Sequence, residues 1–201
     1  MSQTVFDKAI LSRPRYGVLA LRPGSGHLMV ADGEGACAIL DVLAGATSLA
    51  TTHIIYIRGA NGVDGSGDLQ ALGAAQFLRA PSFAAALPRL RKVLADAHMG
   101  LQIYAAGTEG LMGQVQREVI AAGLPHSALQ MEHRGSLARR VQCVHCKGVT
   151  ENVTYDPFQC SHCGLNLFVR DHYSRRIAAF QGVNIDAEDP GLVPPSVERF
   201  A

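Results

Sequence analysis

The stretch HLMVADGEGACAILDVLAG, residues 27–45, decides the fold, because it has the pattern of a strand, a tight turn and a helix. The run HLMVA (27–31) is short and apolar, as in a buried strand. Residues 35–44 place apolar side chains on one helical face, namely Ala36, Ile39, Leu40 and Leu43. Gly45 follows as a C-terminal cap. A strand that passes through a glycine turn into an amphipathic helix predicts a βαβ succession.

The same alternation continues to about residue 132. The other strand candidates are YGVLALR (16–22), HIIYIR (53–58), LQIYAA (101–106) and SALQM (127–131). Two more helices are expected, over 82–98 with Ser82 as N-cap and over 109–122 with Thr108 as N-cap, while the glycine-rich residues 59–68 form a loop. Pro88 should kink or restart the first of these helices. Because parallel strands need helical crossovers, we predict an α/β fold with a Rossmann-like parallel sheet over residues 1–138.

The turn after the first strand carries a weak nucleotide-binding pattern. Gly33, Gly35 and Ala38 match GxGxxA, which in dinucleotide-binding folds lets a pyrophosphate approach the helix N-terminus. Asp32 and Glu34, however, place two negative charges where a phosphate would lie. We therefore interpret the pattern as a tight strand-to-helix turn and expect no cofactor-binding and no catalytic residues here.

Composition narrows the class of protein. The 201 residues are 48% hydrophobic and 17% charged with a formal net charge of +1, which predicts a globular protein and makes nucleic acid an unfavourable partner. The N-terminus has no apolar run of signal-peptide length, and no segment has roughly 20 consecutive apolar residues. We expect a cytoplasmic protein with no membrane partner.

Two CxxC pairs end the α/β pattern. Cys143, Cys146, Cys160 and Cys163 lie in the segment CVHCKGVTENVTYDPFQCSHCG (143–164), with thirteen residues between the pairs. Such pairs form tight knuckles that a hairpin brings together around a tetrahedral metal. We predict a four-cysteine ribbon over 139–185, of zinc-ribbon or rubredoxin-like type, and an extended tail over 186–201. Zinc is the expected metal, and a single rubredoxin-like iron is the alternative, since tetrahedral sulfur suits both.

Two histidines could be additional metal ligands, and the fifth cysteine could be a reactive thiol. His145 and His162 each precede the second cysteine of a pair, where side chains usually point outward, so we expect them to face solvent or a partner. Cys37 stands alone at the start of an apolar helix and is expected to be a buried small hydrophobe.

Two segments also resemble known families. GTEGLMGQVQREVIAAGLP (107–125) resembles the last helix of the NAD domain in ferredoxin-reductase-type flavoproteins, and ALQMEHRGSLARRVQC (128–143) resembles the linker by which such reductases pass to an electron-transfer domain. The whole arrangement, ending in FQCSHCGLNLFVRDHYSRRIAAFQGVNID (158–186), resembles the small subunit of bacterial dimethylamine monooxygenase.

That resemblance implies a function and partners. In that family a haem-bearing subunit carries the oxygen chemistry, and a flavin/iron-sulfur reductase brings electrons from NADPH for the oxidative demethylation of a secondary amine. The chain would then be a non-catalytic assembly or electron-transfer subunit of this complex. Two alternatives remain open, a nucleotide-binding reductase component and a nucleic-acid-binding zinc ribbon.

Overall fold

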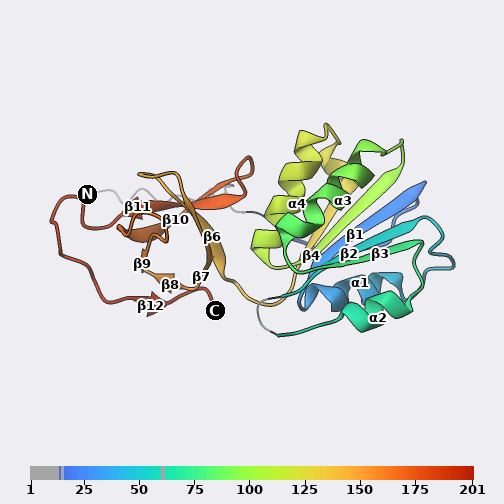
Figure 1. Ribbon diagram of the computed structural model, residues 1–201, viewed down its shortest axis with the longest axis horizontal. Helices are drawn as coiled ribbons and strands as arrows, with labels where there is room; N and C mark the ends of the chain where they lie inside the picture. Colours follow the sequence, from blue (N-terminus) through green and yellow to red (C-terminus); the bar gives the residue numbers. More distant parts are fainter. Residues whose placement is uncertain (1–13, 15, 60–61) are drawn as a thin grey trace, which may run out of the picture.

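The computed structural model describes residue 14, residues 16–59 and residues 62–201, and it contains two five-stranded sheets joined by residues 134–138 (Figure 1). The half of the molecule that contains the first sheet has five strands with helices between them. In chain order these are β1 (Gly26–Asp32), α1 (Gly35–Leu43), β2 (Thr52–Ile57), α2 (Ser66–Ala71), β3 (Gln76–Ala80), α3 (Phe83–Ala95), β4 (Leu101–Gly107), α4 (Glu109–Ala121), the 3-10 helix η1 (His126–Ala128) and β5 (Leu129–His133).

The first sheet is parallel throughout, with strand order β3-β2-β1-β4-β5. This is the order of the first five strands in doubly wound nucleotide-binding sheets. Helices α1 and α2 cover one face, and α3 and α4 cover the other (Figure 1). The predicted α/β class and parallel sheet are therefore confirmed, and β1 lies at its centre.

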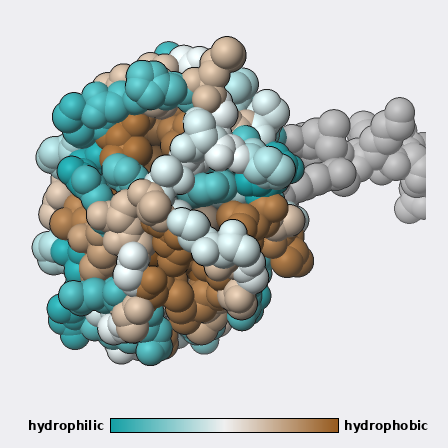
Figure 2. All heavy atoms as spheres, turned by 90° about the vertical axis from the view of Figure 1, so that its right-hand side faces the viewer, coloured by the Kyte–Doolittle hydropathy of each residue, from teal (hydrophilic) through white to brown (hydrophobic). Residues whose placement is uncertain are grey.

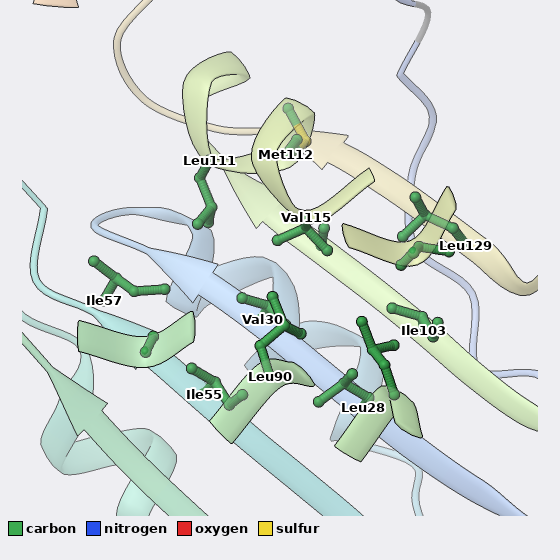
Figure 3. Close-up of a cluster of buried hydrophobic side chains, with 14 of the residues drawn as sticks. Leu28, Val30, Ile55, Ile57, Leu90, Ile103, Leu111, Met112, Val115 and Leu129 are labelled. Carbon is green, nitrogen blue, oxygen red and sulfur yellow. The ribbon is translucent and has the colours of Figure 1, made fainter. Parts of the chain in front are cut away.

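Both faces of the central strands are buried, which explains their continuous apolar runs. Leu28 and Val30 of β1 point toward α3 and α4, where they join a cluster that Figure 3 shows in close-up. Met29 and Ala31 point to the opposite face, toward α1. The alternation follows from the two-residue period of a strand, because neighbouring side chains leave on opposite faces.

The helix starts agree with their predicted caps. The Ser82 hydroxyl accepts a hydrogen bond from the Ala85 N–H, and the Thr108 hydroxyl accepts one from the Leu111 N–H. Each bond satisfies an N–H that has no partner inside its helix. Helix α3 runs through Pro88 as one element.

Residues 16–22 are not a strand, so that prediction is wrong. The segment runs beside β5, but its backbone N–H groups donate to side chains of that strand. The Leu19 N–H donates to the Glu132 carboxylate at 2.7 Å, and the Ala20 N–H donates to the side-chain carbonyl of Gln130 at 3.0 Å. Side-chain acceptors satisfy these groups without a regular ladder. Sequence reasoning also missed β3 and α2, and α2 begins inside the glycine-rich segment that was expected to be a loop.

The second sheet carries the cysteines. Its strands are β6 (Arg139–Cys143), β7 (Val149–Val153), β9 (Phe158–Gln159), β10 (Asn166–Ser174) and β11 (Ala179–Asn184), in the order β7-β6-β11-β10-β9, while β8 (Tyr155–Asp156) and β12 (Val197–Glu198) form a separate pair. Strands β6 and β11 are parallel, and the other pairs in this cysteine-bearing sheet are antiparallel. It meets the first sheet at α4, where Gly113 leaves room for the Tyr173 hydroxyl.

A cation clamped between aromatic rings ties the end of the chain to this sheet. The Arg139 guanidinium lies 4.1 Å from the ring centroids of both Phe180 and Phe200, and it pairs with Asp171 at 2.8 Å. A desolvated cation–π contact is worth about 2 kcal/mol. The tail that was expected to be extended is exposed over 187–199, but Phe200 returns to the core of the sheet.

Among the described residues, no helix has both the length and the apolar character needed to cross a membrane.

Replacing Phe200 with alanine tests the clamp. Phe200→Ala should lower the free energy of unfolding of the cysteine-bearing sheet by about 3 kcal/mol, because a buried ring is lost and one face of the Arg139 guanidinium becomes exposed. Urea unfolding measures the change. Val197→Ala is the control, since Val197 is 58% exposed and should change stability by less than about 0.5 kcal/mol. Equal stability of the two variants would contradict the clamp.

Candidate metal centre

The four cysteines sit on two turns that are built alike. Cys143 ends β6 and Cys160 follows β9, and each begins a knuckle. In the first, the Lys147 N–H donates to the Cys143 carbonyl at 3.0 Å; in the second, the Gly164 N–H donates to the Cys160 carbonyl at 3.0 Å. Lys147 and Gly164 both have positive φ, 63° and 74°. This conformation suits glycine, and Lys147 adopts it at some cost.

The knuckles bring all four sulfur atoms together. Every pair of Sγ atoms lies within 4.8 Å, with Cys143 and Cys163 at 3.9 Å and Cys146 and Cys160 at 3.7 Å. A tetrahedral metal with sulfur ligands at ~2.3 Å requires sulfur atoms about 3.8 Å apart. The donor set therefore fits a tetrahedral thiophilic metal.

One side of the cluster is buried and the other is exposed. Cys143 and Cys160 are buried against Leu167, with Phe158 and Leu165 packed around them, whereas Cys146 and Cys163 are exposed. A bound metal would thus be shielded by the sheet on one side and accessible to a protein partner on the other.

Hydrogen bonds shift the pKa values of two cysteines in opposite directions. Burial raises the pKa of Cys160, but hydrogen bonds from the backbone N–H groups of Cys163 and His162 and from the thiols of Cys163 and Cys146 outweigh burial and lower it to about 6. The N–H of Leu165 lowers the pKa of Cys163, whereas desolvation and the three neighbouring thiols raise it to about 12. Sulfur atoms this close cannot all be charged unless a cation lies among them. A cation among the four sulfur atoms would therefore favour their thiolate forms.

The two histidines lie outside the sulfur cluster. Both are exposed, as predicted, and the His162 Nε2 lies 3.0 Å from the Val149 carbonyl. Cys37, in contrast, is exposed on α1, so its prediction as a buried hydrophobe is wrong. The helix turns this residue away from the face that carries Ala36 and Ile39.

The glycine turn after β1 is explained by contacts within the protein. A Cβ atom at Gly35 would collide with the Ala106 carbonyl, so the glycine lets α1 pack closely against β4. The Asp32 carboxylate accepts two hydrogen bonds from Thr108, at 2.8 Å from its N–H and 2.6 Å from its hydroxyl. An acidic side chain therefore occupies the N-terminus of α4, where a ligand phosphate would otherwise be favoured. Sequence reasoning saw the charge of Asp32 but not this partner, because the two residues are far apart in the chain.

The hollow at the carboxyl ends of the parallel strands is small. It has a volume of about 130 Å³ and lies between Asp32, Gly59 and Thr108 on one side and Arg140 and Glu151 of the cysteine-bearing sheet on the other. Ligand pockets usually measure about 300–1,000 Å³. A dinucleotide does not fit in this space as it stands.

Serine variants test the metal centre. Cys160→Ser should lose the bound metal and unfold the cysteine-bearing sheet, because three thiolates and a hydroxyl bind a thiophilic metal more weakly. Cys37→Ser, which removes the exposed cysteine of α1, should keep one metal per chain and wild-type stability. Elemental analysis and thermal unfolding report both properties. A full complement of metal in the Cys160→Ser variant would contradict the assignment.

The buried carboxyl of Asp32 gives a pH-dependent prediction. Burial raises its pKa above 3.8, although the hydrogen bonds from Thr108 oppose the shift. The folded state holds this proton to higher pH than the unfolded chain does, so the stabilising contribution of Asp32 is greatest below pH 3.8 and is lost as the pH rises through the raised pKa. Asp32→Asn should therefore gain stability relative to the wild type as the pH rises from below 3.8 through the raised pKa. A difference that stays constant with pH, measured by urea unfolding, would contradict the raised pKa.

Comparison with known proteins places both halves of the chain in one family. The dimethylamine monooxygenase subunit DmmA-like N-terminal domain matches residues 8–129, and the C-terminal domain of the same family matches residues 140–183. The heme-dependent oxidative N-demethylase delta subunit of Ectopseudomonas mendocina (strain ymp) is 34% identical over 101 residues, which are 50% of this chain and 58% of that protein. The match thus spans less than two thirds of the relative.

Solved structures give weaker likenesses. Phthalate dioxygenase reductase has a TM-score of 0.47 at 14% identity over 70% of this chain and 47% of its own. The flavohemoglobin of Malassezia yamatoensis has a TM-score of 0.42 at 13% identity over 57% of this chain and 33% of its own. Because the two family matches together span most of the chain, the protein belongs to the dimethylamine monooxygenase subunit DmmA-like family.

Proposed function

We propose that this protein is a non-catalytic subunit of an amine-oxidising monooxygenase, which it serves by assembly or electron transfer. The four-sulfur cluster carries the proposal, because it is the one group of described His, Cys, Asp and Glu side chains arranged to hold a metal. The family and the delta-subunit relative support the setting in a multi-subunit complex. The reaction would be oxidative demethylation of a secondary amine.

Acidic groups near the parallel-strand ends are engaged in structural contacts. Asp32 is bound by Thr108, and Glu132 accepts from the Leu19 N–H and pairs with Arg134 at 2.6 Å. Each of these carboxylates thus has a structural role, which agrees with the proposal that the oxygen chemistry belongs to another subunit.

We propose zinc as the metal, with a single iron as the alternative, and Cys143, Cys146, Cys160 and Cys163 as its ligands. Bound zinc would crosslink the sheet without redox chemistry, and bound iron would accept and release one electron. The exposed edges of Cys146 and Cys163 suit either docking or electron entry. Four reduced cysteines favour a cytoplasmic setting.

The proposed partners are a haem-bearing catalytic subunit and a flavin/iron-sulfur reductase subunit. The relative's name describes a heme-dependent enzyme with a delta subunit, which supports partners of this kind. We also propose that residues 1–138 and 139–185 form separate units, with only the second carrying metal. Both units would then serve as contact surfaces within the complex.

Reconstitution tests the function. The tagged chain, co-expressed with the haem and reductase subunits, should co-purify with them, and omitting it should reduce amine demethylation at least tenfold. A colourless chain with one zinc would establish the scaffold form, and a red chain with one redox-active iron would establish the relay. Full demethylation activity without the chain would overturn the proposal.

The strand order favours one rival, a nucleotide-binding reductase component. Asp32 at the N-terminus of α4 and the small hollow beside it argue against this rival. Titration of the isolated chain with NADPH distinguishes them. The proposal expects no binding at micromolar concentrations, and saturable binding there would favour the reductase.

A further inference from the structure

Residues 186–196, here called the tail loop, stand in solvent although both of their ends are fixed. At the first end the Ile185 N–H donates to the Asn166 carbonyl at 3.0 Å. At the other end the Ser196 hydroxyl donates to the Pro157 carbonyl at 2.5 Å, and β12 then pairs with β8. Figure 1 shows the loop in red on the side of the cysteine-bearing sheet that faces away from the parallel sheet. It is a tethered loop rather than a free tail.

The loop exposes apolar side chains in an ordered backbone. Leu192 is 71% exposed and Val193 is 36% exposed. The Gly191 N–H donates to the Asp186 carboxylate at 3.1 Å, and the Leu192 N–H donates to the Asp189 carbonyl at 3.1 Å. Three prolines further restrict the backbone, at positions 190, 194 and 195. A segment held in shape before binding loses less conformational entropy when it docks.

The tail loop lies beside the metal end of the sheet. Its first anchor, Asn166, comes three residues after Cys163, and its second, Pro157, comes three residues before Cys160. The two anchors thus flank the second knuckle in the chain. Cys163, on that knuckle, is exposed. A protein that contacts the exposed sulfur atoms from this side would also meet the loop.

The charge of the loop indicates the surface that it fits. Acidic residues occupy positions 186, 188 and 189, and the segment 186–196 contains no Lys or Arg. Leu192 and Val193 follow this acidic run after Pro190 and Gly191. Acidic charge next to exposed apolar side chains complements an apolar groove with a basic rim. Proline-rich segments are recognised in apolar, aromatic-lined grooves of this kind.

We propose that the tail loop is a docking element that inserts Leu192 and Val193 into a basic-rimmed apolar groove on the protein that meets the metal end. This inference rests on the proposed function, and the occupant is the haem-bearing subunit because the delta-subunit relative belongs to a heme-dependent enzyme. The acidic residues steer the approach, and the apolar pair holds the bound state. The metal end and the loop together form one contact face.

A binding measurement on the purified full chain and haem-bearing subunit tests the docking element. Leu192→Asp should raise the dissociation constant at least tenfold, because the substitution places a charge in the apolar groove. Because Leu192 is exposed, its substitution should leave the fold intact, and an unchanged metal content of the variant would confirm this. Glu188→Gln with Asp189→Asn should slow association and flatten its salt dependence.

Met99→Ser is the matched control. Met99 is 97% exposed and lies between α3 and β4, in the half of the molecule that contains the parallel sheet. Figure 2 shows exposed hydrophobic side chains on the face of this half that is turned away from the cysteine-bearing sheet. The control substitution should leave the dissociation constant unchanged. Unchanged binding by Leu192→Asp, or an equal loss in both variants, would overturn the docking element while leaving the proposed function in place.

Two further outcomes also decide the proposal. The wild-type chain could form concentration-dependent dimers that the Leu192→Asp substitution abolishes. That result would show that the tail loop binds a second copy of the chain instead of the haem-bearing subunit. If the wild-type chain binds neither the haem-bearing nor the reductase subunit, the proposed function fails and the docking element fails with it.

Discussion

Four sulfur atoms held within 4.8 Å of one another are the constraint on which the second half of the molecule depends. The cysteine-bearing sheet has a small core, with Val141, Tyr173 and Phe180 among its few buried side chains. Small units rarely fold on such a core without a crosslink or a metal. The sulfur cluster supplies one point of closure, and the Arg139 clamp supplies another by fixing the chain end.

The parallel sheet places an acidic side chain where doubly wound folds bind a ligand. Its strand order would place a ligand at the carboxyl ends of β1 and β4. Asp32 instead accepts hydrogen bonds from Thr108, the N-cap residue of α4, so a negative charge of the protein itself lies at the positive end of the helix dipole. The parallel sheet meets the cysteine-bearing sheet through the same helix, α4.

Local patterns predicted the parts of the fold that depend on neighbours in the chain. Ser82 and Thr108 were identified as caps because a hydroxyl needs only the N–H three residues later. Residues 16–22 were wrongly predicted as a strand because their apolar pattern is typical of one. Their N–H groups instead donate to the side chains of Glu132 and Gln130, which lie too far along the chain for a local pattern to show. Strand β3 was missed because it is short and half exposed at the edge of the sheet. The exposure of Cys37 depends on how α1 is rotated against the sheet.

The sequence by itself determined strands β1, β2, β4 and β5, helices α1, α3 and α4 and the spacing of the four cysteines, because local patterns along the chain set each of them. Only the tertiary structure decided that Asp32 meets Thr108, that Arg139 lies between Phe180 and Phe200, and that the tail returns to the sheet. Those contacts join residues 41 to 76 positions apart in the chain. Their free energy comes from burial and charge pairing that exist only once the chain has folded.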